Sequence, residues 1–380
     1  MAPMPETSPI DPRVLLDMVR SGETDLICIL GPTACGKTRY AVELCRKLNA
    51  LSSGADILPE RTLAPEKGGD PLRGEDPRGQ MSAPEDTLTE RTLPPEKGGD
   101  PLCGEDPRGQ MSAPEDTLTE KGGGKAEIIS GDSRQVYRGM DIGTGKDLEE
   151  YGEIPCHLID IADPGTRYTV YDYQRDFEAA YKDICSRGGI PVLCGGSGLY
   201  VQAATCGYQL TNVPPDPGFR AAMEAEDPAE LRRRLLQIKP DTPEGTLQST
   251  RRVIRALEIA RYERQHPVQH SNSLPKKTFY IGILATREER VERIDRRLDE
   301  RLASGLIEEV RGLLARGIDP EDLIYYGLEY KFVTQYVLGI LTYEQMRTLL
   351  ANAIHQFAKR QMTWLRGMEK DGIEIHWTRP

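Results

Sequence analysis

The segment GPTACGKT, from Gly31 to Thr38, constrains the fold of this chain more than any other feature. It follows the apolar run 26–30 and precedes a segment whose apolar residues recur with the helical period. Glycines at its two ends let the backbone curl so that successive N–H groups face an anion, and a helix N-terminus adds positive partial charge. The sequence therefore predicts a buried strand, a phosphate-binding loop and a helix, in that order.

Each residue of the loop is a candidate for binding a diphosphate or triphosphate. The set consists of Gly31, Pro32, Thr33, Ala34, Cys35, Gly36, Lys37 and Thr38. In loops of this kind the lysine reaches the terminal phosphate oxygens and the hydroxyl that follows it ligates Mg²⁺. We therefore expect Lys37 to contact phosphate and Thr38 to bind Mg²⁺. A kinase that holds ATP and an enzyme that holds another diphosphate are both compatible with the loop alone.

A tandem repeat accounts for most of the acidic charge. Residues 61–90 recur at 91–120 with two differences, and together the copies carry −7 of the net charge of −11. The repeat is rich in Pro, Gly and acidic residues, so it cannot bury enough apolar surface to offset the entropy of ordering. We interpret residues 51–126 as a disordered insertion. Two copies without hydrophobic periodicity are too few for a solenoid.

Around this insertion, strand-like and helix-like segments alternate. Short apolar segments at 127–130, 157–163 and 279–285 are typical of buried strands, and 190–200 is typical of a strand that runs into a glycine turn and the start of a helix. Residues 170–187 and 287–316 have the helical pattern. Alternation predicts an α/β fold, with a phosphate-loop-containing parallel sheet and helices on both faces. Ligands bind beyond the carboxyl ends of such strands, where the loop, Asp132 and Ser197 should converge. The expected core comprises residues 1–50, 127–211 and 278–380.

Residues 212–277 differ from this core and predict a basic helical insertion domain. The stretch 229–277 contains eleven Lys or Arg against five Asp or Glu. Within it, Val253 and Ile254 belong to an apolar face, and Arg251, Arg252 and Arg255 share the other face. Two interpretations stay open on charge alone: a surface for a phosphate-rich partner, or a solvated surface of Glu–Arg pairs.

Composition also bounds the cellular setting. The chain has eight cysteines without a CxxC pair, no apolar run long enough for a membrane span, and no secretion signal at its first residues. We expect a cytoplasmic monomer with reduced thiols, no structural zinc and no membrane partner.

Eight segments together resemble the tRNA dimethylallyltransferases, also called tRNA isopentenyltransferases. In chain order they are GPTACGKT, DSRQVYRGMDIGTGK, HLIDI, GGSGLY, RRVIRALE, TREERVERI, YYGLEYK and AKRQMTWLRG. They span the chain except its ends and the insertion. No Cys follows Cys206, so the zinc finger of eukaryotic relatives is absent and the resemblance is to the bacterial type.

The resemblance implies transfer of a dimethylallyl group from its diphosphate to N6 of an adenosine. That adenosine, position 37, lies next to the anticodon in tRNAs reading codons that begin with U. The partners implied are therefore the tRNA anticodon stem-loop and dimethylallyl diphosphate, with Mg²⁺ as cofactor. Lys37, Thr38 and the loop amides would stabilise the leaving diphosphate, and Arg287 would clamp it.

The resemblance also implies roles for further residues in the matching motifs. Asp132 matches the proposed general base, which would accept the proton of the weakly nucleophilic adenine amine. Without the family, Asp132 could equally cap a helix or ligate Mg²⁺. The residues that the resemblance implies in tRNA binding are Asp132, Ser133, Arg134, Gln135, Ser197, Arg251, Arg252, Val253, Ile254 and Arg255. Gln135 would read an adenine edge. His157 and Trp364 are interpreted as packing residues, and the motif AKRQMTWLRG as packing or contacting tRNA backbone.

Three other functions remain for comparison. A small-molecule kinase would use the same loop, but the chain shows no arginine-rich lid. An enzyme that prenylates free AMP or ADP would not need the basic stretch at 229–277. A non-catalytic scaffold built on the acidic repeat conflicts with an intact loop, Asp132 and Arg287.

Overall fold

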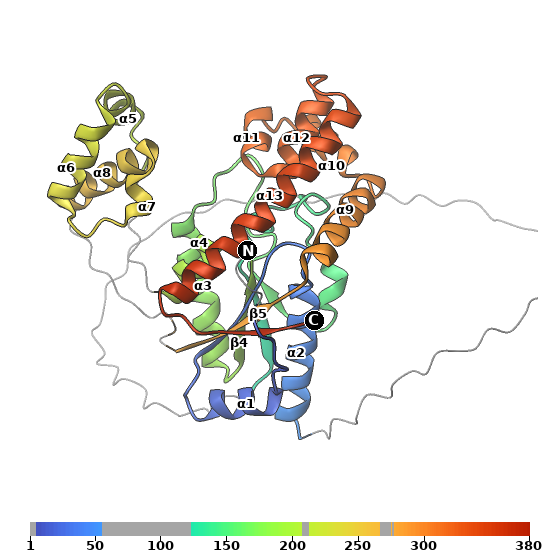
Figure 1. The fold of residues 1–380 in the computed structure, drawn as a ribbon. Helices are drawn as coiled ribbons and strands as arrows, with labels where there is room; N and C mark the ends of the chain where they lie inside the picture. Colours follow the sequence, from blue (N-terminus) through green and yellow to red (C-terminus); the bar gives the residue numbers. More distant parts are fainter. Residues whose placement is uncertain (1–4, 55–122, 207–212, 267–274, 276) are drawn as a thin grey trace, which may run out of the picture. The chain divides into compact units, whose positions relative to one another are not determined.

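The computed structural model describes residues 5–54, 123–206, 213–266, 275 and 277–380 (Figure 1). The acidic repeat lies outside the described residues. The insertion was expected to span residues 51–126, but residues at both ends of this range belong to the described fold. At the first end, α2 (Lys37–Ser52) continues past Ala50. On the other side, the backbone N–H of Gly124 donates to the carbonyl of Gly188, and that of Ala126 donates to Asn49 Oδ1 at 2.6 Å.

A six-stranded sheet forms the centre of the fold. The strands are β1 (Leu26–Leu30), β2 (Ala126–Ser130), β3 (Cys156–His157), β4 (Ile190–Gly195), β5 (Thr278–Ile283) and β6 (Ile375–Thr378). Their order is β3-β2-β4-β1-β5-β6, and every pairing is parallel. The predicted parallel α/β sheet is thus confirmed. The edge strand β6 was not predicted.

The expected strand at 157–163 is the main error in the predicted sheet. Only Cys156 and His157 pair with β2. Leu158 and Asp160 have φ values of 64° and 55°, which turn the chain out of the extended conformation. Ala162 forms an isolated bridge with Tyr137 instead.

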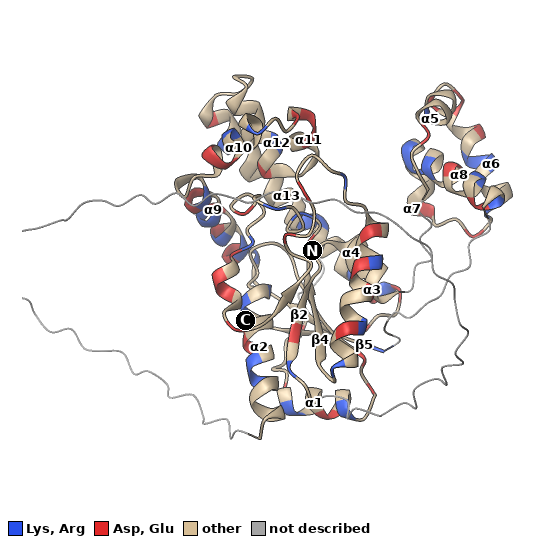
Figure 2. Ribbon diagram, turned by 180° about the vertical axis from the view of Figure 1, so that it is seen from behind, with Lys and Arg blue, Asp and Glu red and all other residues tan. Residues whose placement is uncertain are grey.

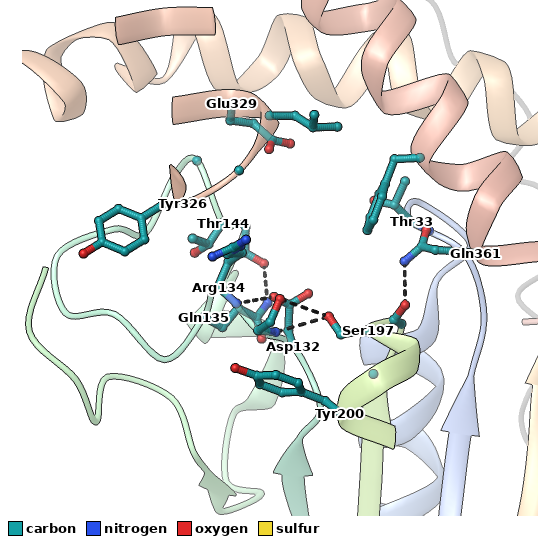
Figure 3. A pocket seen from close by; sticks show the side chains of 18 of the residues that line it. Thr33, Asp132, Arg134, Gln135, Thr144, Ser197, Tyr200, Tyr326, Glu329 and Gln361 are labelled. Atoms are coloured by element: carbon teal, nitrogen blue, oxygen red, sulfur yellow. Dashed lines mark hydrogen bonds between the residues drawn. The ribbon is translucent and has the colours of Figure 1, made fainter. Parts of the chain in front are cut away.

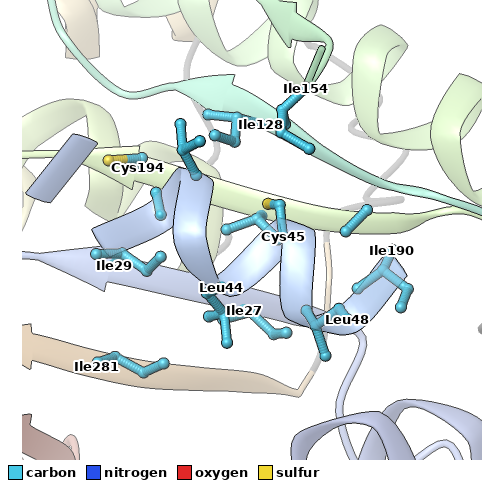
Figure 4. Packing of buried hydrophobic residues seen from close by; sticks show 14 of the residues in the cluster. Ile27, Ile29, Leu44, Cys45, Leu48, Ile128, Ile154, Ile190, Cys194 and Ile281 are labelled. Carbon is cyan, nitrogen blue, oxygen red and sulfur yellow. The ribbon is translucent and has the colours of Figure 1, made fainter. Parts of the chain in front are cut away.

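Helices cover both faces of the sheet. On one face lie α1 (Pro12–Arg20) and α2, and on the other lie α3 (Val170–Ser186), α4 (Gly198–Thr205) and the second half of α13 (Tyr343–Lys370). The alternation of β1 explains this division, because Ile27 and Ile29 join the first cluster while Leu26, Cys28 and Leu30 join the second. Figure 4 shows Leu44, Cys45 and Leu48 of α2 packed over the first face.

A third apolar cluster is built mainly by the C-terminal helices. It joins the loop after β2 to α9 (Arg287–Ala303), α10 (Leu306–Ala315), α11 (Pro320–Tyr325), α12 (Leu328–Val337) and the first half of α13. A single helix was expected over 287–316. Two form instead, because Gly305 adopts φ 101°, a left-handed conformation that stops α9. A short 3₁₀ helix, η1 (Leu148–Tyr151), completes the described core.

The predicted basic helical segment contains four helices that pack on one another. They are α5 (Pro217–Glu224), α6 (Pro228–Ile238), α7 (Glu244–Leu247) and α8 (Thr250–Gln265). Met223, Leu231, Leu235 and Leu257 are among the buried residues of its own small core. Acidic and basic residues are both spread along the ribbons of these helices (Figure 2). Pairs such as Arg234–Glu226 and Lys239–Glu263 show that part of the basic charge is neutralised locally.

Candidate active site

Three loops that follow neighbouring strands meet at the carboxyl end of the sheet. The phosphate loop follows β1, residues 131–135 follow β2, and residues 196–197 follow β4, which pairs with both. The backbones approach so closely that only glycine fits: a Cβ on Gly195 would lie 2.6 Å from the carbonyl oxygen of Gly131. A Cβ on Gly31 would lie 2.6 Å from Cys35 Sγ. The predicted convergence of the loop, Asp132 and Ser197 is therefore present.

These loops border a cavity of about 790 Å³ (Figure 3). From the phosphate loop it is lined by Thr33, Ala34, Lys37 and Thr38. The expected contact residues Asp132, Ser133, Arg134, Gln135 and Ser197 also line it. The opposite side comes from α9, α12, α13 and the residues between α11 and α12. A cavity of this size accommodates a small ligand, and the set combines polar groups with apolar and aromatic side chains.

The phosphate loop has the backbone geometry for binding an anion. Ala34 and Gly36 adopt φ values of 60° and 91°, and no side chain caps the N-terminus of α2. Its amides therefore remain available for an anion, as in other left-handed loop nests. The Lys37 ammonium donates to the carbonyl of Pro32 at 2.8 Å. Burial raises the pKa of the Cys35 thiol, so this residue is neutral and contributes its backbone.

Asp132 presents a carboxylate to the cavity from a tight turn after β2. Its Oδ1 accepts from the backbone N–H of Arg134 at 2.8 Å, and its own N–H donates to Ser130 Oγ at 3.3 Å. These bonds fix the turn and leave Oδ2 without a hydrogen-bond partner among the described residues. Asp132 does not cap a helix, which removes one of the interpretations open from the sequence.

The side chains beside Asp132 differ in how free they are to bind a substrate. The amide of Gln135 is occupied at both ends: Oε1 accepts from Ser130 Oγ at 3.0 Å, and Nε2 donates to the carbonyl of Gly145 at 2.9 Å. In this arrangement Gln135 holds two loops together, and a contact with an adenine edge would use the second N–H of Nε2 and the second lone pair of Oε1. Arg134 lies over the ring of Tyr325, 5.4 Å from its centroid.

Several residues that line the cavity were not predicted from the sequence to belong to the site. Glu329 and Arg301 form a pair at 3.5 Å, and burial raises the pKa of Glu329 while Arg301 opposes that shift. Glu329 lies on α12, across the cavity from Asp132 (Figure 3). Gln361 and Trp364 of α13 also line the cavity, so Trp364 is more than the packing residue expected. Both residues belong to AKRQMTWLRG, whose sequence suggests no partner for either.

Arg287 does not line the cavity. It is exposed at the first position of α9, inside a Thr286–Glu289 capping box that fixes the helix start. Arg290, one turn further, is partly buried, and burial lowers its pKa while the Cys35 thiol opposes the shift.

The five residues of α8 that were expected to bind tRNA differ in their exposure and in their partners. Val253 and Ile254 are buried in the small core, so their side chains are not exposed for contact. Arg255 pairs closely with the buried carboxylate of Glu258 and donates to the carbonyl of Val213 at 2.9 Å. Arg251 and Arg252 are exposed, and neither has an acidic partner among the described residues.

The oxygen groups beside the phosphate loop are suited to Mg²⁺. The Thr38 hydroxyl and the Asp132 carboxylate both line the cavity, and Mg²⁺ is usually held by one or two protein oxygens plus phosphate and water. Within the described ranges there is no cluster of three His, Cys, Asp or Glu side chains that would form a complete metal cage. The donor set therefore fits an ion that arrives with a phosphate ligand.

His157, expected to be a packing residue, also lies within hydrogen-bond distance of a buried carboxylate. Its Nε2 lies 2.7 Å from Oε2 of the buried Glu127 on β2. Arg187, which follows α3, donates two hydrogen bonds to the same carboxylate.

Among the helices described, none is long and apolar enough to cross a membrane.

The fold and the site define an α/β protein that places an anion-binding loop beside a carboxylate in one cavity. A family model described as IPP transferase matches residues 135–368. A tRNA dimethylallyltransferase 2 of Bacteroides fragilis is 51% identical over 255 residues, which are 66% of this chain and 83% of that protein. One from Porphyromonas gingivalis is 51% identical over 257 residues, with shares of 67% and 85%.

A solved structure agrees with these relatives. The tRNA isopentenylpyrophosphate transferase of Bacillus halodurans superimposes with a TM-score of 0.54 and 29% identity, covering 93% of this chain and 89% of that one. The chain therefore belongs to the IPP transferase family, and the resemblance seen in its motifs is confirmed.

Proposed function

We propose that this protein transfers the dimethylallyl group of dimethylallyl diphosphate to N6 of the adenosine that follows the anticodon of tRNAs reading codons beginning with U. The observation that carries the proposal is that a phosphate loop and Asp132 open into one cavity. The names of relatives in the family add that those proteins act on tRNA. We infer that this protein works in the cytoplasm, where tRNA is found, and that it is a monomer.

The phosphate loop would bind the diphosphate, which is the leaving group. Negative charge grows on the bridging oxygen as the allylic C–O bond breaks, so preorganised donors stabilise the transition state more than the bound donor. The amides after Ala34 and the Lys37 ammonium supply those donors. Lys37 would exchange its bond to the Pro32 carbonyl for a phosphate oxygen. Mg²⁺, held by Thr38 and by phosphate, would supply further charge neutralisation when bound.

Asp132 would act on the acceptor. The exocyclic amine of adenine attacks the allylic carbon, a C–N bond forms, and one amine proton must leave. The free Oδ2 of Asp132 is the group in the cavity suited to accept that proton, while Oδ1 stays bonded to Arg134 N–H. The products are N6-dimethylallyladenosine and diphosphate.

The acceptor would enter as an unpaired loop nucleotide. A base in an anticodon loop leaves its neighbours at lower cost than one in a duplex. Arg134, above the exposed ring of Tyr325, offers a cation at the cavity edge for the RNA strand. Arg251 and Arg252 would contribute phosphate contacts.

A labelling experiment tests the function directly. The protein is incubated with Mg²⁺ and dimethylallyl diphosphate labelled in the prenyl group, with bulk tRNA in one reaction and AMP in another. We expect label in tRNA, which nuclease digestion releases as N6-dimethylallyladenosine. Label in AMP alone would favour the free-nucleotide alternative, and label in neither, with ATP consumed in a parallel reaction, would favour a kinase.

A further inference from the structure

Gln361 joins two loops that are far apart in the sequence. Its Oε1 accepts from the backbone N–H of Thr33 in the phosphate loop at 2.8 Å. Its Nε2 donates to the carbonyl of Gly196, after β4, at 2.9 Å, as the dashed line in Figure 3 marks. The side chain is buried, with 9% of the residue exposed. One amide thus spans the two loops with both of its ends.

The connection continues to the loop that carries Asp132. Ser197, next to Gly196, accepts from the backbone N–H of Ser133 through its Oγ at 3.2 Å. Ser133 directly follows Asp132. An unbroken series of hydrogen bonds and peptide links therefore runs from Thr33, in the loop expected to hold the diphosphate, to the expected general base.

The position of Gln361 on α13 shows that this bridge is its main interaction. Its helix neighbours Met362, Leu365 and Ala358 are buried in apolar clusters. A buried amide among apolar side chains is costly unless its polar atoms are paired. Here the pairing is made with two loops and not with the helix itself, so α13 holds those loops at a set separation.

From this geometry we propose that Gln361 is a positioning residue, which sets the distance and orientation of the prenyl diphosphate relative to Asp132 and its acceptor base. The inference rests on the proposed function. Transfer needs the allylic carbon and the amine in a near-attack arrangement, and a misplacement of about 1 Å can cost on the order of 10²-fold in rate. In this proposal Gln361 acts through the two loops that it joins and not by contacting a reacting group, so its effect should appear in kcat.

Two variants test the bridge. Gln361→Met keeps the volume and removes both hydrogen bonds, and Gln361→Asn keeps the amide but is one methylene too short to span both partners. For each we expect kcat to fall by roughly 10- to 100-fold, while the separately measured Kd values for donor and for anticodon stem-loop RNA change little. Gln356→Met, at an exposed position of the same helix, is the matched control and should behave like the parent.

The readouts separate positioning from stability. Melting temperature is measured for every variant. A fall in kcat that is accompanied by a large fall in Tm, or by weakened binding of both donor and RNA, would indicate a structural role and overturn the inference. Parental kcat in Gln361→Asn would show that the bridge is dispensable, even where Gln361→Met fails to fold. If the parent protein labels no RNA, the proposed function fails. If the parent labels RNA and both variants match it, only the inference fails.

Discussion

At the scale of single residues, Asp132 is the group on which the chemistry depends. Asp132→Asn keeps an oxygen for the Arg134 amide, so the turn should survive while the proton acceptor is lost. We expect turnover to fall by roughly 10²- to 10⁴-fold, the usual contribution of a positioned base, with Kd for both substrates retained. Single-turnover kinetics with labelled donor measure this. Asp163→Asn, exposed and outside the cavity, is the control. Parental turnover in Asp132→Asn would refute the assignment.

Thr38 gives a second test at this scale, directed at the metal. Thr38→Ala removes the hydroxyl expected to ligate Mg²⁺, and Thr38→Ser retains it. The alanine variant should need a higher Mg²⁺ concentration for half-maximal rate and bind the donor more weakly, because phosphate and metal bind together. The serine variant should resemble the parent. Identical Mg²⁺ titrations for the parent and Thr38→Ala would remove Thr38 from the metal site.

At the scale of elements, α8 presents two arginines that have no acidic partners among the described residues. Changing Arg251 and Arg252 together to Ala should raise the apparent KM for tRNA and reduce the salt slope by about 2, because two phosphates would no longer be neutralised by the protein. Arg255 is left intact, because its pairing with Glu258 stabilises the helical segment. KM is measured over a range of salt concentrations, with Arg233→Ala of α6, paired to Glu230, as the charge control. An unchanged slope would support the alternative of a solvated surface.

Glu127 on the strand β2 makes a pH-dependent contribution to the stability of the fold. Hydrogen bonds from Arg187, and secondarily from His157, lower the pKa of this carboxyl below its usual value of 4.5. A lowered folded-state pKa means that the stabilisation is present above 4.5 and is lost as the pH falls toward the folded value. Glu127→Gln should therefore melt below the parent at pH 7, and the two melting temperatures should converge on acidification below 4.5. A constant difference across this range would contradict the linkage.

At the scale of the whole molecule, the acidic insertion separates two neighbouring elements. We expect that residues 55–122 can be replaced by a four-residue Gly/Ser linker from Gly54 to Gly123 with prenyl transfer retained. Residues 124–126 must stay, because they bond to Gly188 and Asn49. Shortening the connection by about four doublings, at roughly 0.6 kcal/mol each, should stabilise the fold by ~2.5 kcal/mol.

Thermal melting and the tRNA labelling assay measure both effects of this deletion. Limited trypsin digestion of the parent gives an independent check, since its first cuts should fall at Arg and Lys residues of the repeat. A deletion variant that melts like the parent or higher but no longer labels tRNA would show that the insertion takes part in function.

The sequence alone was sufficient to predict the phosphate loop, the α/β class with its parallel sheet, and Asp132 as the carboxylate at its edge. These follow from local patterns: a glycine and lysine spacing, alternating strand and helix periods, and the rule that the ends of parallel strands share one edge. The shortness of β3 and the break between α9 and α10 at Gly305 were not predicted. Both depend on residues with left-handed backbone conformation, which the pattern of apolar residues does not reveal.

Which polar side chains are already bonded within the protein was visible only in the folded chain. Gln135 and Arg255 carry the residue types of substrate contacts, yet each is bonded within the protein. Gln361 lies 328 positions from Thr33 and meets it only because α13 packs back over the sheet. Periodicity reports which face of an element is buried. The partner of a buried polar group is chosen by packing between distant segments, so no local pattern contains it.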